Sequence, residues 1–147
     1  MIYIFDIDGT LADLSHRLPF IQKKPADWDG FYKAAGDDQP IWPVISLVRA
    51  LKEAGGHKII MSSGRSDAIR FLTVEWLRKY RVPFEAIYMR RHEDHREDSV
   101  VKSELLDHIL ADNPTLTVGG VFEDRQQVVD MYRSRGIKVF QVAEGKL

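Results

Sequence analysis

Short apolar runs recur along the chain, separated by longer segments in which apolar residues follow a helical period. The first run, residues 2–7, is rich in isoleucine and aromatic residues and is typical of a strand buried on both faces. Similar runs follow at residues 58–62, 85–89, 116–122 and 137–142. The pattern therefore predicts about five strands.

Helices are predicted in the segments between these strands. The segment that begins at Trp42 has apolar residues at helical spacing, a proline that suits a first turn, and two glycines, Gly55 and Gly56, that commonly end a helix. Further helices are predicted at residues 66–80, 99–110 and 125–135.

Strand and helix thus alternate through most of the chain. This alternation is typical of an α/β, Rossmann-like fold, in which a parallel sheet of about five strands is flanked by helices. With 147 residues, the chain is predicted to form one domain over residues 1–147. Residues 13–41 follow the first strand without a clear period, and their prolines, glycines and aromatic residues predict a small insert or cap-like segment.

Composition excludes several classes of protein. Lys and Arg number 21 and Asp and Glu 22, and the resulting net charge of −1 argues against strong non-specific binding to nucleic acid. The absence of cysteine excludes disulfides, cysteine-ligated zinc and thiol catalysis. The sequence shows neither an apolar run long enough for a membrane span nor a signal peptide, so we expect a cytoplasmic protein without membrane contact.

Chemically reactive residues gather where the predicted strands end. Asp6 and Asp8 stand at the end of the first strand, Ser63 follows the second, and Asp124 follows the fourth. Because the carboxyl ends of parallel strands meet at one edge of a sheet, the fold would bring these residues and Lys102 into one crevice. Crowded carboxylates require a cation, and oxygen ligands of this kind favour Mg²⁺.

These sites resemble, in their order and strand context, the four motifs of the haloacid dehalogenase (HAD) superfamily. The stretch DIDGT at residues 6–10 is similar to the first motif, Ser63 to the second and Lys102 to the third. Glu123 and Asp124 are similar to the fourth motif. The resemblance implies the HAD fold and a phosphatase activity that depends on Mg²⁺.

Nearly the whole chain further resembles the 3′-phosphatase domain of phage-type polynucleotide kinase–phosphatases. The matching stretches are FDIDGTLA (5–12) with Arg17 downstream, SSGR (62–65), REDSVVK (96–102), EDRQQVVDMYR (123–133) and QVAEG (141–145). The phosphate-binding loop G-x-x-x-x-G-K-[ST] does not occur, so no kinase activity is expected of this chain. Glu123 departs from the domain, which has Asp at that position, and this leaves the geometry there open.

The resemblance implies a role for each matching residue. Asp6 would attack phosphorus to form an aspartyl-phosphate, and Asp8 would act as general acid and then as base, with a pKa above that of Asp6. The implied catalytic residues are Asp6, Asp8, Ser63 and Lys102. The residues implied to hold Mg²⁺ are Asp6, Asp8 (through its backbone carbonyl), Asp124 and Glu123. The residues implied to contact substrate are Thr10, Arg17, Gly64, Arg65, Arg90 and Asp98.

The implied function is removal of 3′-phosphates from polynucleotide ends, or from 3′-nucleotides, during nucleic-acid end repair. The alternative enzyme is a HAD phosphatase of small metabolites such as 5′-nucleotides or sugar phosphates, and the alternative class is a phosphate-binding module without turnover. The implied partner is a phosphorylated nucleic-acid end or nucleotide. A homo-oligomer and a separate kinase or ligase partner are also open.

Two groups of side chains have two interpretations each. Trp28, Phe31, Tyr32 and Trp42 can either pack the insert, which is the commoner role of such residues, or stack on a nucleic-acid base. His92 and His95 could ligate a metal, but their position in a charged loop favours surface residues.

Overall fold

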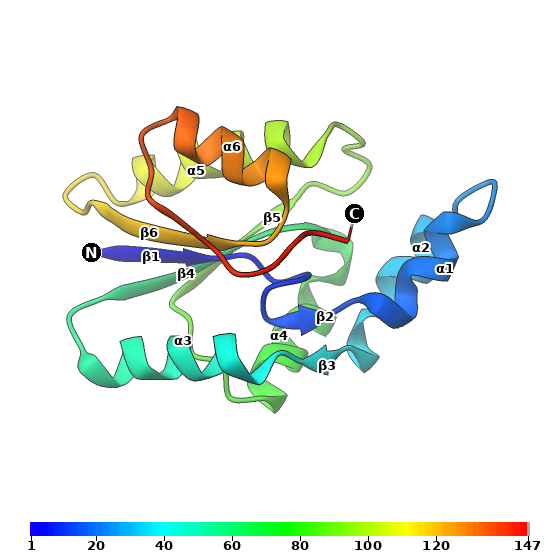
Figure 1. Cartoon of the computed structure of the whole chain (residues 1–147), viewed down its shortest axis with the longest axis horizontal. Coiled ribbons are helices and arrows are strands. Elements are labelled where there is room, and N and C mark those ends of the chain that lie inside the picture. Colours follow the sequence, from blue (N-terminus) through cyan, green and yellow to red (C-terminus); the bar gives the residue numbers. More distant parts are fainter. Residues whose placement is uncertain (147) are drawn as a thin grey trace.

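The computed structural model describes residues 1–146, and its centre is a five-stranded parallel sheet (Figure 1). The strands are β1 (Ile2–Phe5), β4 (Lys58–Ser66), β5 (Ala86–Arg90), β6 (Val118–Glu123) and β7 (Val139–Gln141). They lie in the order β5-β4-β1-β6-β7, so β1 is the central strand. The chain first adds β4 and β5 on one side of β1 and later adds β6 and β7 on the other, so the order of the strands changes direction at β1. The predicted α/β, Rossmann-like fold is therefore confirmed.

Helices cover both faces of the sheet. α3 (Trp42–Ala54) and α4 (Arg70–Lys79) lie on one face, and α5 (Asp98–Asp112) and α6 (Gln126–Ser134) lie on the other (Figure 1). Gly55, with a φ of +76°, ends α3 in a conformation that favours glycine, as predicted. None of the helices within the described residues is both long and apolar enough to cross a bilayer.

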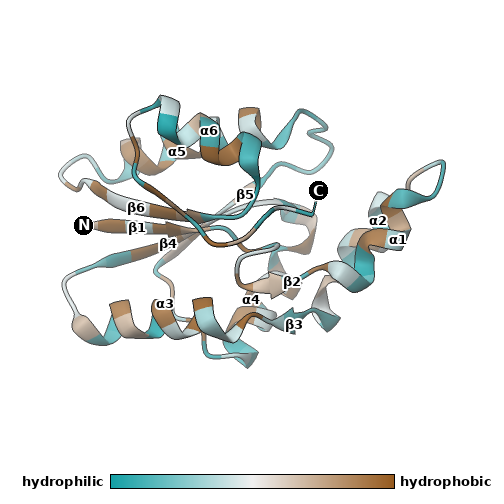
Figure 2. Cartoon of the chain, viewed as in Figure 1, coloured by the Kyte–Doolittle hydropathy of each residue, from teal (hydrophilic) through white to brown (hydrophobic). Residues whose placement is uncertain are grey.

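The core consists of one apolar cluster on each side of the sheet. Ile2 and Ile4 pack into the cluster beneath α5 and α6, whereas Phe5 packs into the cluster beneath α3 and α4. Successive side chains of a strand point to opposite faces, so a central strand covered on both sides must be apolar throughout. In Figure 2, the central strand β1 is accordingly mostly brown, the colour of hydrophobic residues.

The segment between β1 and α3 contains short elements that have no periodic signature. They are β2 (Ala12–Asp13), η1 (Ser15–Arg17), α1 (Leu18–Gln22), α2 (Trp28–Lys33), η2 (Ala34–Asp37) and β3 (Gln39–Pro40). β2 pairs antiparallel with β3 to form a small hairpin at its base. α1 and α2 project beyond the carboxyl ends of the sheet strands (Figure 1), so this insert stands beside the expected site.

The second strand is longer than predicted. β4 continues to Ser66, because its pairing with β5 resumes between Ser66 and Arg90 after an irregularity that starts at Ser63. Ser63, Gly64 and Arg65 therefore belong to the strand, and the prediction that it ends at residue 62 was wrong. The following helix begins as a single 3₁₀ turn (Asp67–Ile69), which the side chain of Ser66 caps by accepting a hydrogen bond from the amide of Ala68.

Candidate active site

A cavity of about 520 Å³ opens at the carboxyl ends of the sheet strands. The predicted site residues that line it are Asp6, Asp8, Gly64, Arg90, Asp98, Glu123 and Asp124. β1, β4 and β6 are neighbours in the sheet, so their ends meet at this point although they are far apart in the sequence. The structure thus brings Asp6, Asp8 and Asp124 together, as the strand ends predicted, and Lys102 reaches Asp6 from below the surface of the cavity, whereas Ser63 is not among the lining residues.

Asp6 lies at the centre of a buried cluster of charges. The Nζ of Lys102 donates to Asp6 Oδ1 over 2.6 Å and to Glu123 Oε2 over 2.7 Å. The hydroxyl of Thr10 donates to the other oxygen of Asp6 over 3.2 Å. Burial, and then the nearby Glu123 carboxylate, raise the pKa of Asp6 to about 8 despite the Lys102 ammonium. Asp6 is therefore held in place at both oxygens, and its ionised form needs a further cation.

Asp124 lies next to Asp6, and its ionised form is disfavoured in the same way. Burial, and then the Asp6 carboxylate, raise the pKa of Asp124 to about 7. Gly9, with a φ of +83°, makes room for this side chain, because a Cβ at Gly9 would lie 2.1 Å from Asp124 Oδ2. The glycine of the DIDGT stretch is thus needed both for its backbone conformation and for the close approach of Asp124.

The acidic cluster fits a divalent cation. Asp6, Glu123 and Asp124 each offer a carboxylate oxygen, and these oxygens lie within 4.8 Å of one another. Both oxygens of Glu123 are already engaged, since Oε2 accepts from Lys102 and Oε1 accepts from the backbone amides of Asp124 and Arg125. Glu123 thus accepts three hydrogen bonds and orients Lys102 and the turn after β6, whereas Asp6 accepts one at each oxygen. Asp6 and Asp124 are therefore the residues that would hold the ion.

The side chain of Asp8 turns away from this cluster. Its Oδ1 accepts hydrogen bonds from Arg17 Nη2 over 2.7 Å and from Arg65 Nη2 over 2.7 Å. Although burial opposes it, the two guanidinium groups lower the pKa of Asp8. Without metal or substrate, the order is therefore the reverse of the one predicted for the loaded site, because the arginines face Asp8 whereas burial and Glu123 raise the pKa of Asp6.

Arg17 and Arg65 were expected to contact the substrate directly, but the structure places them elsewhere. Both side chains are fully buried and lie behind Asp8. Arg17 also donates to the carbonyl of Phe31, and Arg65 Nη1 donates to the hydroxyl of Thr73. Their geometry assigns them to the orientation and charge of Asp8.

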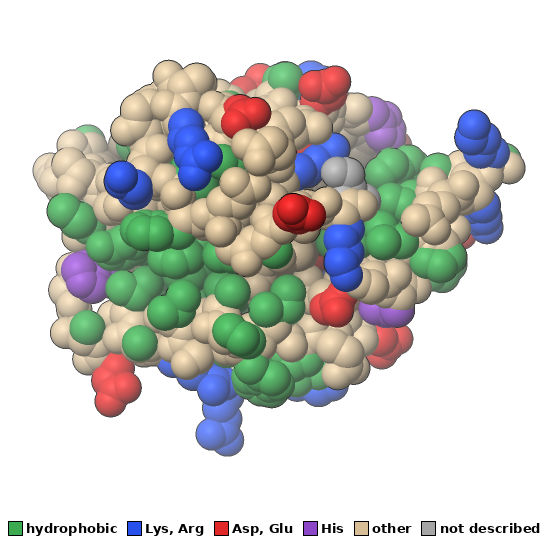
Figure 3. Space-filling model, in the orientation of Figure 1, with side chains coloured by type: hydrophobic (Ala, Val, Ile, Leu, Met, Phe, Trp, Pro, Cys, Tyr) green, Lys and Arg blue, Asp and Glu red, His purple; other side chains and the backbone are tan. Residues whose placement is uncertain are grey.

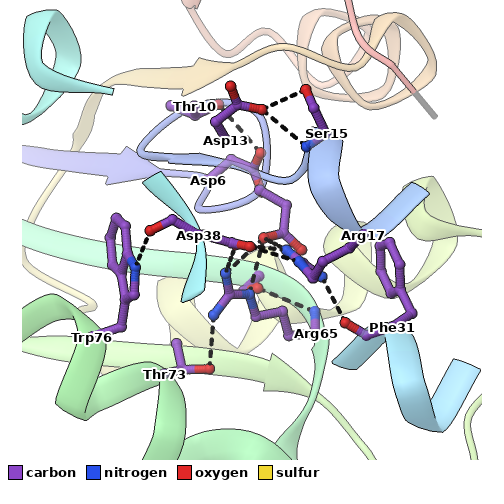
Figure 4. A network of polar contacts seen from close by, with 12 residues as sticks. Asp6, Thr10, Asp13, Ser15, Arg17, Phe31, Asp38, Arg65, Thr73 and Trp76 are labelled. Carbon is purple, nitrogen blue, oxygen red and sulfur yellow. Dashed lines mark hydrogen bonds and ion pairs between the residues drawn. The ribbon is translucent and has the colours of Figure 1, made fainter. Parts of the chain in front are cut away.

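Asp38, from the end of the insert, completes this network and was missed by the sequence analysis. Its side chain is fully buried and accepts from Arg17 Nε and Nη2 at 2.8 Å and from Arg65 Nη2 at 3.0 Å (Figure 4). Its backbone carbonyl accepts from the indole of Trp76 over 2.9 Å. Asp38 therefore ties both arginines to the insert and to α4.

We expect Asp38→Asn to destabilise the fold by about 3 kcal/mol, because it leaves two buried guanidinium groups with one carboxylate. Urea unfolding followed by circular dichroism measures this loss. Asp37→Asn is the matched control, since Asp37 is the adjacent and exposed aspartate and should change stability by less than about 0.5 kcal/mol. Equal stability of the two variants would contradict the structural role of Asp38.

Gly64, Arg90 and Asp98 shape the wall of the cavity, whereas Ser63 is buried and is not among its lining residues. Arg90 donates to the carbonyls of Gly64, Asp94 and Arg96 and to Asp98 Oδ1, so it holds the loop of residues 91–97 in place. A Cβ at Gly64 would lie 2.1 Å from Asp98 Oδ1, which explains a glycine at that position. The hydroxyl of Ser63, which is 1% exposed, accepts from the amide of Arg65.

Comparisons with known proteins agree with this geometry. The family described as "Polynucleotide kinase PNKP phosphatase domain" matches residues 1–147. A chain in the "Structure of the Pnkp1/Rnl/Hen1 RNA repair complex" is 32% identical, with a TM-score of 0.82 over 99% of this chain and 43% of that chain. A chain in the "Structure of Pnkp1/Rnl/Hen1 complex" is also 32% identical, with a TM-score of 0.81 over 99% and 47%.

A more distant structure shares the fold. The haloacid dehalogenase-like hydrolase SP0104 from Streptococcus pneumoniae is 15% identical, with a TM-score of 0.68 over 95% of this chain and 83% of that chain. The present chain spans less than half the length of the two chains from the Pnkp1 complexes. Because the family match extends over the whole chain, the protein belongs to the PNKP phosphatase-domain family of HAD-like phosphatases.

Proposed function

We propose that this chain is a Mg²⁺-dependent phosphomonoesterase that removes 3′-phosphates from polynucleotide ends or 3′-nucleotides through an aspartyl-phosphate. The observation that carries this proposal is the position of Asp6, whose carboxylate is held by Lys102 and Thr10 at the inner end of the cavity, beside Asp124. A weak nucleophile held in this way needs only correct alignment with phosphorus and neutralisation of charge.

In the first step, an oxygen of Asp6 attacks phosphorus, and the bond between phosphorus and the 3′-oxygen of the sugar breaks. Lys102, which is almost completely buried against Asp6, offsets the negative charge that accumulates on the nucleophile and the phosphoryl group. A divalent cation held by Asp6 and Asp124 would withdraw charge from the phosphoryl oxygens and favour the ionised form of Asp6.

Asp8 would donate a proton in the first step and accept one in the second. Its side chain is 16% exposed and lines the cavity two residues from Asp6. A dianionic phosphate bound nearby opposes the effect of Arg17 and Arg65 and raises the pKa of Asp8, so that the carboxyl group can give a proton to the departing sugar oxygen. In the second step, the Asp8 carboxylate takes a proton from the water that hydrolyses the aspartyl-phosphate.

The substrate class is supported by the comparisons and by the size of the cavity. The description of the matched family names the phosphatase domain of a polynucleotide kinase, and one related structure is described as an RNA repair complex. At about 520 Å³, the cavity has room for more of a substrate than its phosphate group. We therefore place the activity in nucleic-acid end repair, where a separate kinase or ligase would act on the same ends.

The test is a panel of phosphate esters assayed with Mg²⁺ and after removal of metal with EDTA. The panel holds a 3′-phosphorylated oligonucleotide, its 5′-phosphorylated counterpart, free 3′- and 5′-nucleotides, and sugar phosphates. We expect the highest kcat/KM on the 3′-phosphates, and loss of activity with EDTA that added Mg²⁺ reverses. A preference for 5′-nucleotides or sugar phosphates would instead support a metabolite phosphatase. If no ester is turned over, a phosphate-binding module without catalytic activity would be supported.

A further inference from the structure

The cavity has one wall that the proposed chemistry does not use. This wall is formed by α2 in the insert, where Trp28, Phe31 and Tyr32 line the cavity, which the loop of residues 91–97 also lines. In the space-filling view, hydrophobic side chains lie where the insert meets the body of the molecule (Figure 3). The reacting carboxylates Asp6 and Asp8 line the same cavity, so a group bound at this wall would be continuous with the phosphate site.

The three aromatic side chains of this wall have different environments. Phe31 is 2% exposed and packs with its ring 4.4 Å beneath the guanidinium carbon of Arg17. Trp28 is 47% exposed, and its ring meets the ring of Phe31 edge-on at 5.5 Å. Phe31 is thus a core residue, whereas Trp28 presents a large aromatic surface to the cavity.

The position of Trp28 is coupled to the reacting groups by direct packing. Trp28 rests on Phe31, Phe31 rests on Arg17, and Arg17 binds Asp8. Tyr32 packs against both residues, with its ring 6.1 Å from that of Trp28 and 5.6 Å from that of Phe31. The aromatic surface is therefore held at a defined place relative to the site of phosphoryl transfer.

The loop of residues 91–97, which also lines the cavity, carries side chains of both charges, with Glu93 and Asp94 beside Arg91. Arg91, His92 and His95 are exposed there, and His92 is held by contacts from its ring to Ser66 and from its amide to Asp67. An exposed aromatic surface in the cavity that also holds the phosphate site is suited to a nucleotide, whose flat base can stack on it while the phosphate is bound beside Asp6. A small sugar phosphate has no flat ring that could use this surface.

From these observations we infer that Trp28 is the stacking surface for the base of the nucleotide that carries the 3′-phosphate. This inference rests on the proposed function and specifies how the substrate is recognised. Stacking on an indole accepts any base, because every base has a π-face, so the enzyme should show little preference for sequence at the terminal position.

The test compares two 3′-phosphorylated oligonucleotides that differ only in the terminal residue, which carries a base in one and is abasic in the other. We expect Trp28→Ala to lower kcat/KM about tenfold on the base-bearing end, mainly through KM, and to leave the abasic end unchanged. Trp28→Phe, which keeps a flat ring, should recover most of the loss.

Trp42 provides a matched control. It is 50% exposed but lies at the start of α3, where its ring packs edge-on against Tyr80. Trp42→Ala should leave kcat/KM on both oligonucleotides unchanged. An equal loss on the two ends with Trp28→Ala, or no loss at all, would overturn the inference while leaving the proposed function intact.

The two proposals fail in distinguishable ways. If the wild-type protein hydrolyses neither oligonucleotide, the proposed function is wrong and the inference fails with it. A binding measurement separates the loss of stacking from misfolding of the variant. In the inactive Asp6→Asn variant, a 3′-phosphorylated oligonucleotide with a terminal base should quench tryptophan fluorescence more than the abasic oligonucleotide does. That difference should disappear when Trp28→Phe is added, and its persistence would overturn the inference.

Discussion

Asp6→Asn is expected to abolish hydrolysis of every ester that the protein turns over, with kcat reduced by at least about 10⁴-fold. An amide cannot form the bond to phosphorus, and the neighbouring Lys102, Thr10 and Asp124 cannot replace it, because they hold the nucleophile or would hold the cation. Initial rates on a 3′-phosphorylated oligonucleotide and on an aryl phosphate measure the loss.

The same substitution should leave the fold intact. Burial raises the pKa of Asp6 from 3.8 to about 8 in the protein without metal. An acid whose folded pKa is raised costs stability as pH rises from its unfolded pKa toward its folded pKa, because the unfolded chain ionises first. A neutral amide removes this cost, so the unfolding temperature of the metal-free variant at pH 8 should equal or exceed that of metal-free wild type. Sustained turnover by both Asp6→Asn and Asp6→Ala would exclude Asp6 as the nucleophile.

Asp8→Asn is expected to reduce kcat about 10³-fold on a 3′-phosphorylated oligonucleotide, because a sugar oxygen leaves poorly without a proton. The loss in the first step should be much smaller on p-nitrophenyl phosphate, since nitrophenolate needs no proton to leave. Hydrolysis of the aspartyl-phosphate would still be slow, because no base activates the water. Stopped-flow measurement should therefore show a burst of nitrophenolate close to one equivalent of enzyme, followed by slow turnover.

The network around Asp8 makes a second measurement necessary. The substitution leaves Arg17 and Arg65 with Asp38 as the carboxylate that both still contact, so the unfolding temperature should fall. Rates are therefore measured well below that temperature. If the oligonucleotide and p-nitrophenyl phosphate lose activity equally and no burst occurs, Asp8 orients the site and does not transfer the proton.

The sequence was sufficient to predict the fold and the acidic centre of the site. Buried strands are continuous apolar runs, and crossovers between parallel strands bring all their carboxyl ends to one edge. Asp6, at the end of β1, and Asp124, after β6, could therefore be placed in one cavity from their positions in the pattern. Lys102 followed from the same order of motifs, and the structure puts its ammonium on Asp6.

Only the tertiary structure decided which charged side chains contact one another. Asp38 lies 21 residues after Arg17 and 27 before Arg65, in an insert without periodicity, so no sequence spacing links the three. In the protein without metal or substrate, Arg65 and Arg17 lower the pKa of Asp8, whereas burial and Glu123 raise that of Asp6. Likewise, composition could not separate Trp28 in the cavity from Phe31 in the core. Secondary structure follows from local patterns, whereas pKa values and exposure depend on groups that folding brings together from distant segments.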